Sequence, residues 1–301
     1  MSYPRDLKGY GRTPPQAEWP NGARLALSIV LNYEEGAEYS VLHGDPHSES
    51  ILSDLGVMSP IIGARNLNIE QLYGYGSRVG VWRLLDLFGE RRIPLTIYAV
   101  GMALERNPEV ATAIVAAGHE VASHGWRWID YQDMPEAEER QHISRAVATI
   151  ERLTGQRPLG WYTGRPSPNT RRLVVAEGGF LYDSDAYDDD LPYWVTVDGK
   201  GHLVIPYSFN NNDSRFTRSQ GFDLADEFFA YLRDGFDWLY AEGAKTPRMM
   251  SVGLHCRLIG KPGRIGGLAR FLDHVRRHDD VWLCRRVDIA RHWHTRHPYG
   301  A

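Results

Sequence analysis

The chain has 301 residues, of which 43% are hydrophobic and 24% are charged, and its formal net charge is −4. This length allows one large α/β barrel or two modest domains, and the mild acidity argues against nucleic acid as a partner. Two cysteines do not make a disulfide framework, residues 2–8 are too polar for a signal peptide, and no run approaches the roughly 18 apolar residues of a membrane span. We therefore expect a cytoplasmic protein without a membrane partner.

Residues 1–24 are rich in proline, glycine and aromatic residues, which predicts an arm on the surface or on a neighbouring subunit. The apolar run 25–31 is typical of a parallel strand covered on both faces. Glu34 and Glu35 follow this run, and adjacent side chains on an extended segment point in opposite directions, so one carboxylate can face a pocket. Two acids at a strand end indicate acid/base or metal chemistry, although a solvated polar loop has the same pattern.

A long tract without regular periodicity, about residues 37–77, predicts a lid or binding loop. Strands and helices then alternate. We expect strands at 95–100, 120–123, 158–161, 180–182, 202–205, 249–254 and 281–284, and helices at 77–89, 107–118, 135–155, 167–178, 224–240, 265–277 and 287–294. Repeated strand–helix units imply a parallel sheet with helices outside, and no nucleotide-binding motif follows a strand, so a closed or partly closed βα barrel fits best.

Polar side chains recur where the predicted strands end. Besides the two glutamates, these are His124, Trp126, Trp128, Arg165, Asp183, Asp185, His255 and Arg257. In βα barrels the working residues lie at the carboxyl ends of the strands, so this recurrence favours an active site over a solvated loop. We expect the two aspartates to orient Arg165 or a histidine, and Cys256 to be a plain thiol.

The chain resembles the polysaccharide deacetylases with a NodB-like domain, and within them the metal-independent allantoinases, from about Tyr3 to Arg291. The stretch 32–36 matches their Thr-Phe-Asp-Asp-Gly motif, so Glu34 stands at the catalytic base and Glu35 at the metal-binding aspartate. The stretch 124–128 matches their His-Ser/Thr-x-x-His motif, with Trp128 in place of the second histidine.

Two further motifs carry the resemblance. Arg165 and Pro166 match the family's arginine motif, and 253–255 resembles the Leu-x-His motif, whose histidine is the general acid, with Gly253 in place of the leucine. The stretch 255–264 is similar to the allantoinase-like branch. The resemblance implies a single domain, residues 1–301, folded as a distorted TIM-like (β/α)7 barrel of the polysaccharide deacetylase type, with the arm at about 1–24 and a loop insertion at about 37–77.

The predicted site follows from the motifs and the strand ends. We predict Glu34, Glu35, His124, Arg165 and His255 as catalytic residues and Tyr33, Trp126, Trp128, Trp161 and Arg257 as substrate-binding residues. A hydrolytic zinc site needs three protein ligands and an open position, and Trp128 cannot be a ligand. We therefore expect no metal and no other cofactor. Weak binding of a metal ion between His124 and Glu35 is kept as an alternative.

The leading function is metal-independent hydrolysis of a ring amide of allantoin to allantoate, with a small cyclic ureide as the partner. Glu35 is favoured as the base because His124 could bind the same water, and His255 would be the acid. Arg165, Arg257, the Trp126 indole N–H or backbone amides would stabilise the oxyanion. The alternatives are a metal-dependent N-deacetylase of a cell-wall polysaccharide, a cyclic imide hydrolase and a non-catalytic binding domain. The arm predicts a homo-oligomer, and the resemblance implies a tetramer.

Overall fold

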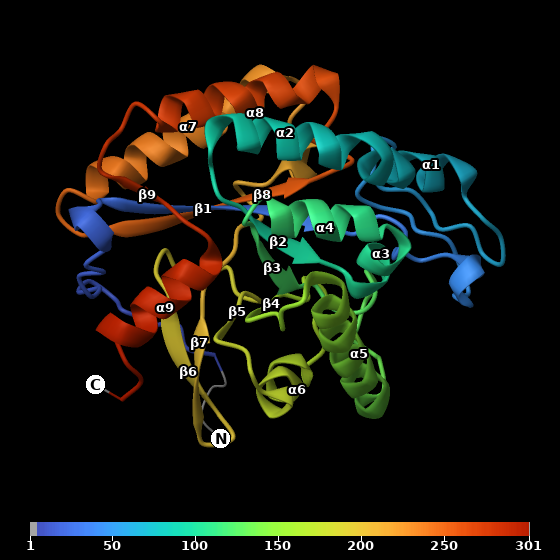
Figure 1. Ribbon diagram of the computed structural model, residues 1–301, viewed down its shortest axis with the longest axis horizontal. Helices are drawn as coiled ribbons and strands as arrows, with labels where there is room; N and C mark the ends of the chain where they lie inside the picture. Colours follow the sequence, from blue (N-terminus) through green and yellow to red (C-terminus); the bar gives the residue numbers. More distant parts are fainter. Residues whose placement is uncertain (1–4, 301) are drawn as a thin grey trace.

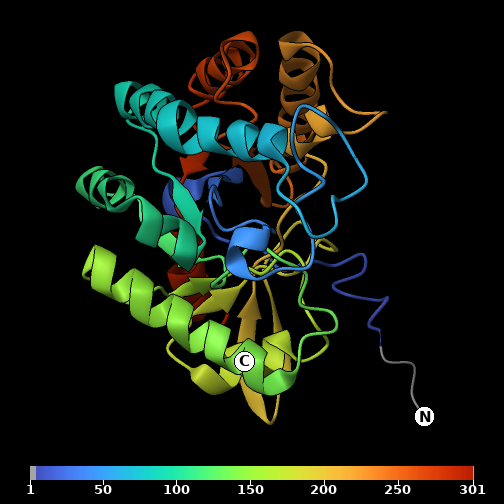
Figure 2. The same ribbon diagram turned by 90° about the vertical axis from the view of Figure 1, so that its right-hand side faces the viewer.

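The computed structural model describes residues 5–300, whose centre is a nine-stranded sheet curled into a half-barrel with helices outside (Figures 1 and 2). The strands are β1 (Leu25–Tyr33), β2 (Thr96–Ala99), β3 (Glu120–Ser123), β4 (Gly160–Trp161), β5 (Tyr182–Asp183), β6 (Tyr193–Val197), β7 (Lys200–Val204), β8 (Arg248–His255) and β9 (Val281–Leu283). Their order is β6-β7-β5-β4-β3-β2-β1-β8, with β9 also paired to β1. The predicted distorted βα barrel is confirmed.

Every strand pair in this sheet is parallel except β6 with β7, which form an antiparallel hairpin. Strand β6 was not predicted from the sequence pattern. A single parallel bridge between Asn212 and Gly253 joins the segment after β7 to β8 and brings the two sides of the curled sheet together. Because the strands are parallel, their carboxyl ends meet at one end of the half-barrel.

The helices are α1 (Leu67–Tyr75), α2 (Val81–Arg91), α3 (Gly101–Arg106), α4 (Pro108–Ala116), α5 (Glu136–Thr154), α6 (Thr170–Glu177), α7 (Ala225–Glu242), α8 (Pro262–Val275) and α9 (Arg286–Arg296). Short 3-10 helices span Pro20–Gly22, Val41–His43 and Asp213–Thr217. The sequence pattern did not predict α3. The first helix was predicted to start at 77, whereas α1 begins after Asn66, whose side chain accepts the Ile69 N–H.

A π-helical turn, Gly76–Gly80, joins α1 to α2 and presses closely on the carboxyl ends of β1 and β8. A Cβ on Gly76 would lie 2.3 Å from Glu35 Oε1, and one on Gly80 would lie 2.0 Å from the Cys256 carbonyl oxygen. Larger residues at these two positions would push the turn off the sheet. The two glycines therefore allow the Gly76–Gly80 turn to lie directly against the residues that follow β1 and β8.

The end of the N-terminal arm belongs to the core, which corrects part of the sequence-based expectation. Trp19 is buried, with its ring 5.7 Å from those of Trp282 and Trp293, and its indole N–H donates to the Arg248 carbonyl oxygen at 2.9 Å. The expected surface or intersubunit position is wrong for this residue, because its apolar partners come from distant parts of the chain. Within residues 5–300, no helix is long and apolar enough to cross a membrane.

Candidate active site

A cavity of about 260 Å³ opens at the carboxyl ends of the strands. Five predicted residues line it: Glu34, His124, Trp128, Arg165 and His255. The segment between β1 and α1, drawn in light blue in Figure 2, crosses in front of the sheet at this end, and its Ile51, Leu52 and Val57 form one wall of the cavity. The tract predicted as a lid therefore contributes directly to the site.

Glu34 lies at the centre of the site and is fully buried. Its Oε1 is 3.2 Å from His124 Nε2 and 3.6 Å from His255 Nε2, while Oε2 makes a 2.7 Å ion pair with Arg257. Burial raises the pKa of Glu34. Arg257, His255 and His124 together lower this pKa by a larger amount, so that the net pKa lies well below the ordinary value. Glu34 is therefore ionised at neutral pH and can accept a proton.

His255 is held by Asp213, a carboxylate that the sequence analysis missed. Its Nδ1 donates to Asp213 Oδ1 at 2.6 Å, and the other carboxylate oxygen accepts the backbone N–H groups of His255 and Ile259 at 2.7 and 3.1 Å. Burial lowers the pKa of His255, but Asp213 and Glu34 raise it more strongly, so the net pKa lies above the usual range. The imidazolium can thus donate a proton from Nε2.

No sequence signal marked Asp213, because it lies in the 3-10 helix after β7 rather than at a strand end. A rule that pairs a general-acid histidine with an orienting carboxylate predicts that such a partner exists. It does not identify that partner among the 38 acidic residues of the chain.

The His124 ring lies between two hydrogen-bond acceptors. Nδ1 is 3.2 Å from the Tyr162 carbonyl oxygen and Nε2 is 3.2 Å from Glu34 Oε1. Burial lowers the pKa of His124 by more than Glu34 raises it, and a neutral imidazole carries only one N–H. When Nδ1 carries that hydrogen, Nε2 and Glu34 Oε1 are both acceptors and can form a hydrogen bond only if a proton lies between them. His124 can thus help to hold a proton that Glu34 has accepted.

Glu35 points away from the cavity. Its Oε2 accepts the Glu34 backbone N–H at 3.0 Å, and its Oε1 is 3.4 Å from Arg257. The expectation that His124 and Glu35 bind the same water is wrong, because His124 contacts Glu34 instead. Successive side chains of extended backbone diverge, and only Glu34 lies on the side that faces the interior of the half-barrel.

Arg257 lies behind the two glutamates and does not line the cavity, which corrects its predicted role in substrate and oxyanion binding. Its Nε donates to the Leu52 carbonyl oxygen at 2.8 Å, and its guanidinium lies 4.0 Å above the Tyr73 ring. The buried Arg257 cation compensates the charge of Glu34, while burial and the neighbouring Glu34 raise the pKa of Glu35. Arg257 therefore sets the charge state of Glu34 and anchors the wall of the cavity.

Three of the predicted substrate-binding aromatic residues also lie outside the cavity lining. The Tyr33 hydroxyl bonds Ser77 Oγ at 2.8 Å, the Trp126 ring packs under Arg145 at 3.7 Å, and the Trp161 N–H donates to a threonine hydroxyl at 2.7 Å. These contacts satisfy the polar groups of Tyr33 and Trp161 inside the protein. The three side chains are packing residues, because the strand and loop geometry turns them away from the cavity.

Arg165 and Trp128 do line the cavity, and each has a buried nitrogen without a hydrogen-bond partner within residues 5–300: Arg165 Nη2 and Trp128 Nε1. The guanidinium lies 4.1 Å above the indole ring, and Nη2 is 3.8 Å from Glu49 Oε2. Buried donors normally have hydrogen-bond partners, so Trp128 Nε1 and Arg165 Nη2 are suited to donate to a bound acceptor. A substrate carbonyl oxygen is such an acceptor.

Asp183 and Asp185 do not contact Arg165. Asp183 binds Arg171 at 2.7 Å and His202 at 3.0 Å, which agrees with the predicted pairing to a histidine, and Asp185 accepts backbone N–H groups of the loop after β4. The Cys256 thiol is buried and donates weakly to the Asn32 carbonyl oxygen at 3.6 Å. Burial raises the pKa of this thiol, as expected of an unreactive cysteine.

The donor set at the cavity does not fit a tightly held divalent ion. A hydrolytic zinc site needs three ligand atoms converging on one point. Glu35 points away and Trp128 offers no ligand atom. Glu34, His124 and His255 remain, but within residues 5–300 they do not bring three ligand atoms within 4.8 Å of one another, and Arg257 holds one Glu34 oxygen. The cavity can instead combine an ionised carboxylate, a charged histidine and two N–H donors that make no hydrogen bond within residues 5–300 around a small molecule.

Comparison with known proteins agrees with this architecture. The family model described as polysaccharide deacetylase matches residues 69–177. A Schizosaccharomyces pombe protein assigned to the polysaccharide deacetylases is 42% identical over 316 aligned positions, which cover 99% of each chain. The chain belongs to the polysaccharide deacetylase family. It is therefore related to hydrolases that act on carbon–nitrogen bonds of amides.

Two crystal structures are similar to this member of the family over nearly their whole length. One is of a protein named Puue allantoinase, at 61% identity and a TM-score of 0.98, covering 99% of this chain and 100% of the other. The second, from Pseudomonas aeruginosa PAO1, is likewise assigned to the polysaccharide deacetylases, at 60% identity, a TM-score of 0.97 and the same coverage. Relatives of equal similarity thus carry two different functional names.

Proposed function

We propose that the protein hydrolyses a ring amide of allantoin to give allantoate, without a metal ion. The observation that carries this proposal is the composition of the cavity: an ionised Glu34 lies beside a charged His255, and Trp128 and Arg165 each have an N–H donor without a hydrogen-bond partner in the described residues. Allantoin is small, neutral and rich in carbonyl groups and N–H groups. Such a molecule can fill a pocket that offers both hydrogen-bond donors and acceptors.

Glu34 acts as the general base in this mechanism. A water molecule beside Oε1 loses a proton to Glu34 as its oxygen attacks the ring carbonyl carbon, and His124 shares the proton that Glu34 receives. The carbonyl oxygen gains negative charge, which the N–H donors of Arg165 and Trp128 stabilise. Arg257 keeps Glu34 ionised before the attack.

His255 acts as the general acid. As the ring carbon–nitrogen bond breaks, His255 Nε2 protonates the leaving nitrogen, which becomes the terminal nitrogen of a ureido group. The attacked carbon becomes the carboxylate of allantoate. Asp213 holds the opposite side of the imidazole, so that Nε2 stays directed at the same region as Glu34.

The size of the cavity favours this reaction over deacetylation of a polysaccharide, which the names of two relatives suggest. Small-molecule sites typically measure about 300–1,000 Å³, and this cavity of about 260 Å³ lies just below that range. Ile51, Leu52 and Val57 form one wall of this cavity, whose volume suits a small cyclic ureide.

The test is hydrolysis by the purified protein after treatment with a chelator. We expect allantoate to form from allantoin at an undiminished rate, with much slower hydrolysis of succinimide and no release of acetate from N-acetylated chito-oligosaccharides. If the chelator abolishes hydrolysis and zinc restores it, the metal-independent mechanism is wrong. Acetate release without ureide hydrolysis would establish the deacetylase alternative instead.

We also propose that the chain assembles into a homo-oligomer, with a tetramer as the expected state. The supporting feature is the exposure of apolar side chains on the tract between β1 and α1: Leu42, Val57 and Ile62 are 65%, 78% and 73% exposed. Contact with another subunit would remove these side chains from water. A monomeric mass in light scattering would contradict this proposal.

A further inference from the structure

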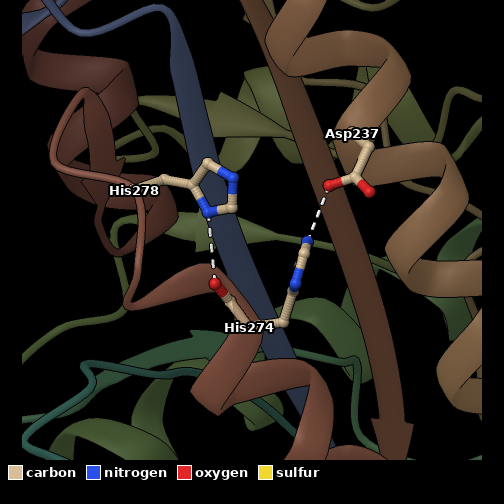
Figure 3. A group of neighbouring side chains, drawn as sticks. All are labelled: Asp237, His274 and His278. Atoms are coloured by element: carbon tan, nitrogen blue, oxygen red, sulfur yellow. Dashed lines mark hydrogen bonds and ion pairs between the residues drawn. The ribbon is translucent and has the colours of Figure 1, made fainter.

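Three potential metal ligands lie close together on the outer helix layer (Figure 3). Asp237 lies on α7, His274 in the last turn of α8, and His278 just after α8. One ligand atom from each lies within 4.8 Å of the other two. The ends of α7 and α8 lead into the starts of β8 and β9, so this group lies at the opposite end of the sheet from the cavity, and β8 alone spans roughly 25 Å.

The hydrogen bonds of the group leave one histidine nitrogen ready for a ligand. His278 Nδ1 lies 3.1 Å from the His274 carbonyl oxygen, which can only accept, so Nδ1 carries the hydrogen and Nε2 keeps its lone pair. Histidines that bind metals commonly donate their other ring N–H to a carbonyl in this way. His278 therefore already has the tautomer of a metal ligand.

The other two members form a short contact, with His274 Nε2 lying 2.6 Å from Asp237 Oδ1. Donor atoms around a tetrahedral zinc ion are about 3.3 Å apart, given metal–ligand bonds of about 2.0–2.1 Å. An ion could replace the hydrogen bond if the two side chains separated by less than about 1 Å. Both side chains are partly open to solvent, at 20% for His274 and 46% for Asp237, which allows an ion to enter.

Aromatic rings support the two histidines from behind. The Phe236 ring centroid lies 5.6 Å from that of His274 and 5.0 Å from that of His278, and Tyr240 lies 4.8 Å from His278. The cation of Arg24, which lies over Tyr240, is paired with Asp280. The group thus has an apolar wall on one side and a carboxylate on the other.

We propose that Asp237, His274 and His278 form a binding site for a divalent transition-metal ion such as Zn²⁺, which links α7 to α8. Two imidazoles and one carboxylate leave a fourth position for water. This nitrogen-rich set favours zinc, cobalt, nickel or copper over magnesium and calcium, which prefer oxygen ligands. The ion would hold the ends of the two helices together and would take no part in amide hydrolysis.

The test uses protein that has been stripped with a chelator and then titrated with Zn²⁺ or Co²⁺ in a calorimeter. We expect one ion per chain, a rise in Tm, the intense visible absorption of four-coordinate Co²⁺ and no comparable effect of Mg²⁺. His274→Ala and His278→Ala should each weaken Zn²⁺ binding at least about 100-fold, since loss of an outer partner alone costs about 10–100-fold.

Two matched variants locate the ion. His294→Ala removes a histidine of α9 that bonds the Leu181 carbonyl oxygen, and His124→Asn removes the imidazole of the catalytic cavity; both should bind Zn²⁺ as the parent protein does. Binding at 25 °C is compared among folded variants, so a lower Tm in one of them does not obscure the result. Absence of stoichiometric Zn²⁺ binding, or unchanged binding by His274→Ala and His278→Ala, would overturn the proposal and leave a hydrogen-bonded contact between helices.

Discussion

Replacing the two adjacent glutamates one at a time separates the roles that the structure assigns to them. Glu34 Oε1 faces the cavity between His124 and His255, whereas Glu35 is turned towards Gly76 and the Glu34 backbone. Glutamine has nearly the same shape as glutamate but cannot accept a proton from water as a general base. Glu34→Gln and Glu35→Gln are therefore matched variants at neighbouring positions.

We expect Glu34→Gln to lower kcat for allantoin by about 10²–10⁴, the usual effect of losing one acid/base group. This loss corresponds to about 2.7–5.5 kcal/mol of transition-state stabilisation, at 1.36 kcal/mol for each factor of ten. Glu35→Gln should stay within about tenfold of the parent kcat, well short of that general-base effect. Its amide oxygen can still accept the Glu34 N–H, and Arg257 keeps its 2.7 Å ion pair with Glu34.

The assay is the initial rate of allantoate formation at saturating allantoin, combined with thermal unfolding of each variant. The unfolding measurement matters because Glu34→Gln leaves the buried Arg257 with Glu35 as its remaining carboxylate, at 3.4 Å. Breaking a buried ion pair can cost about 3–5 kcal/mol of stability. If both variants are folded at the assay temperature and Glu35→Gln is as inactive as Glu34→Gln, the assignment of Glu34 as the base is wrong.

Three further outcomes are expected. Asp213→Asn removes the carboxylate that raises the pKa of His255. Since His255 acts in its protonated form, the alkaline limb of the kcat/KM–pH profile should move to lower pH. An alkaline limb at the parent pH would contradict the role of His255 as the acid. Trp128→Phe should lower kcat by up to about 10²–10³ if its N–H stabilises the oxyanion, with little change in Tm, whereas parent-like kcat would exclude that role. Trp19→Ala should lower the free energy of unfolding by about 3–5 kcal/mol in denaturant titrations; a loss below about 1 kcal/mol would contradict a core position for the arm.

Local sequence patterns predicted much of the architecture. The apolar run at 25–31 lies within β1, whose residues are all buried. The helices predicted at 135–155 and 224–240 match α5 and α7 closely. These elements have strong periodicity or clear ends, such as Gly155 in the left-handed conformation after α5. Elements without such signals were missed: α3 has only six residues, and β6 is a partly buried antiparallel edge strand.

The sequence by itself placed Glu34, His124, Arg165 and His255 at the ends of strands, and parallel strands bring those ends together. Only the tertiary structure decided which of two adjacent carboxylates faces the cavity, because alternation along a strand indicates opposite sides but not which side is inside. The same limit applies to Asp213 and Arg257. Their roles depend on contacts with His255, 42 residues away, and with Glu35, 222 residues away, and no local pattern specifies such pairings.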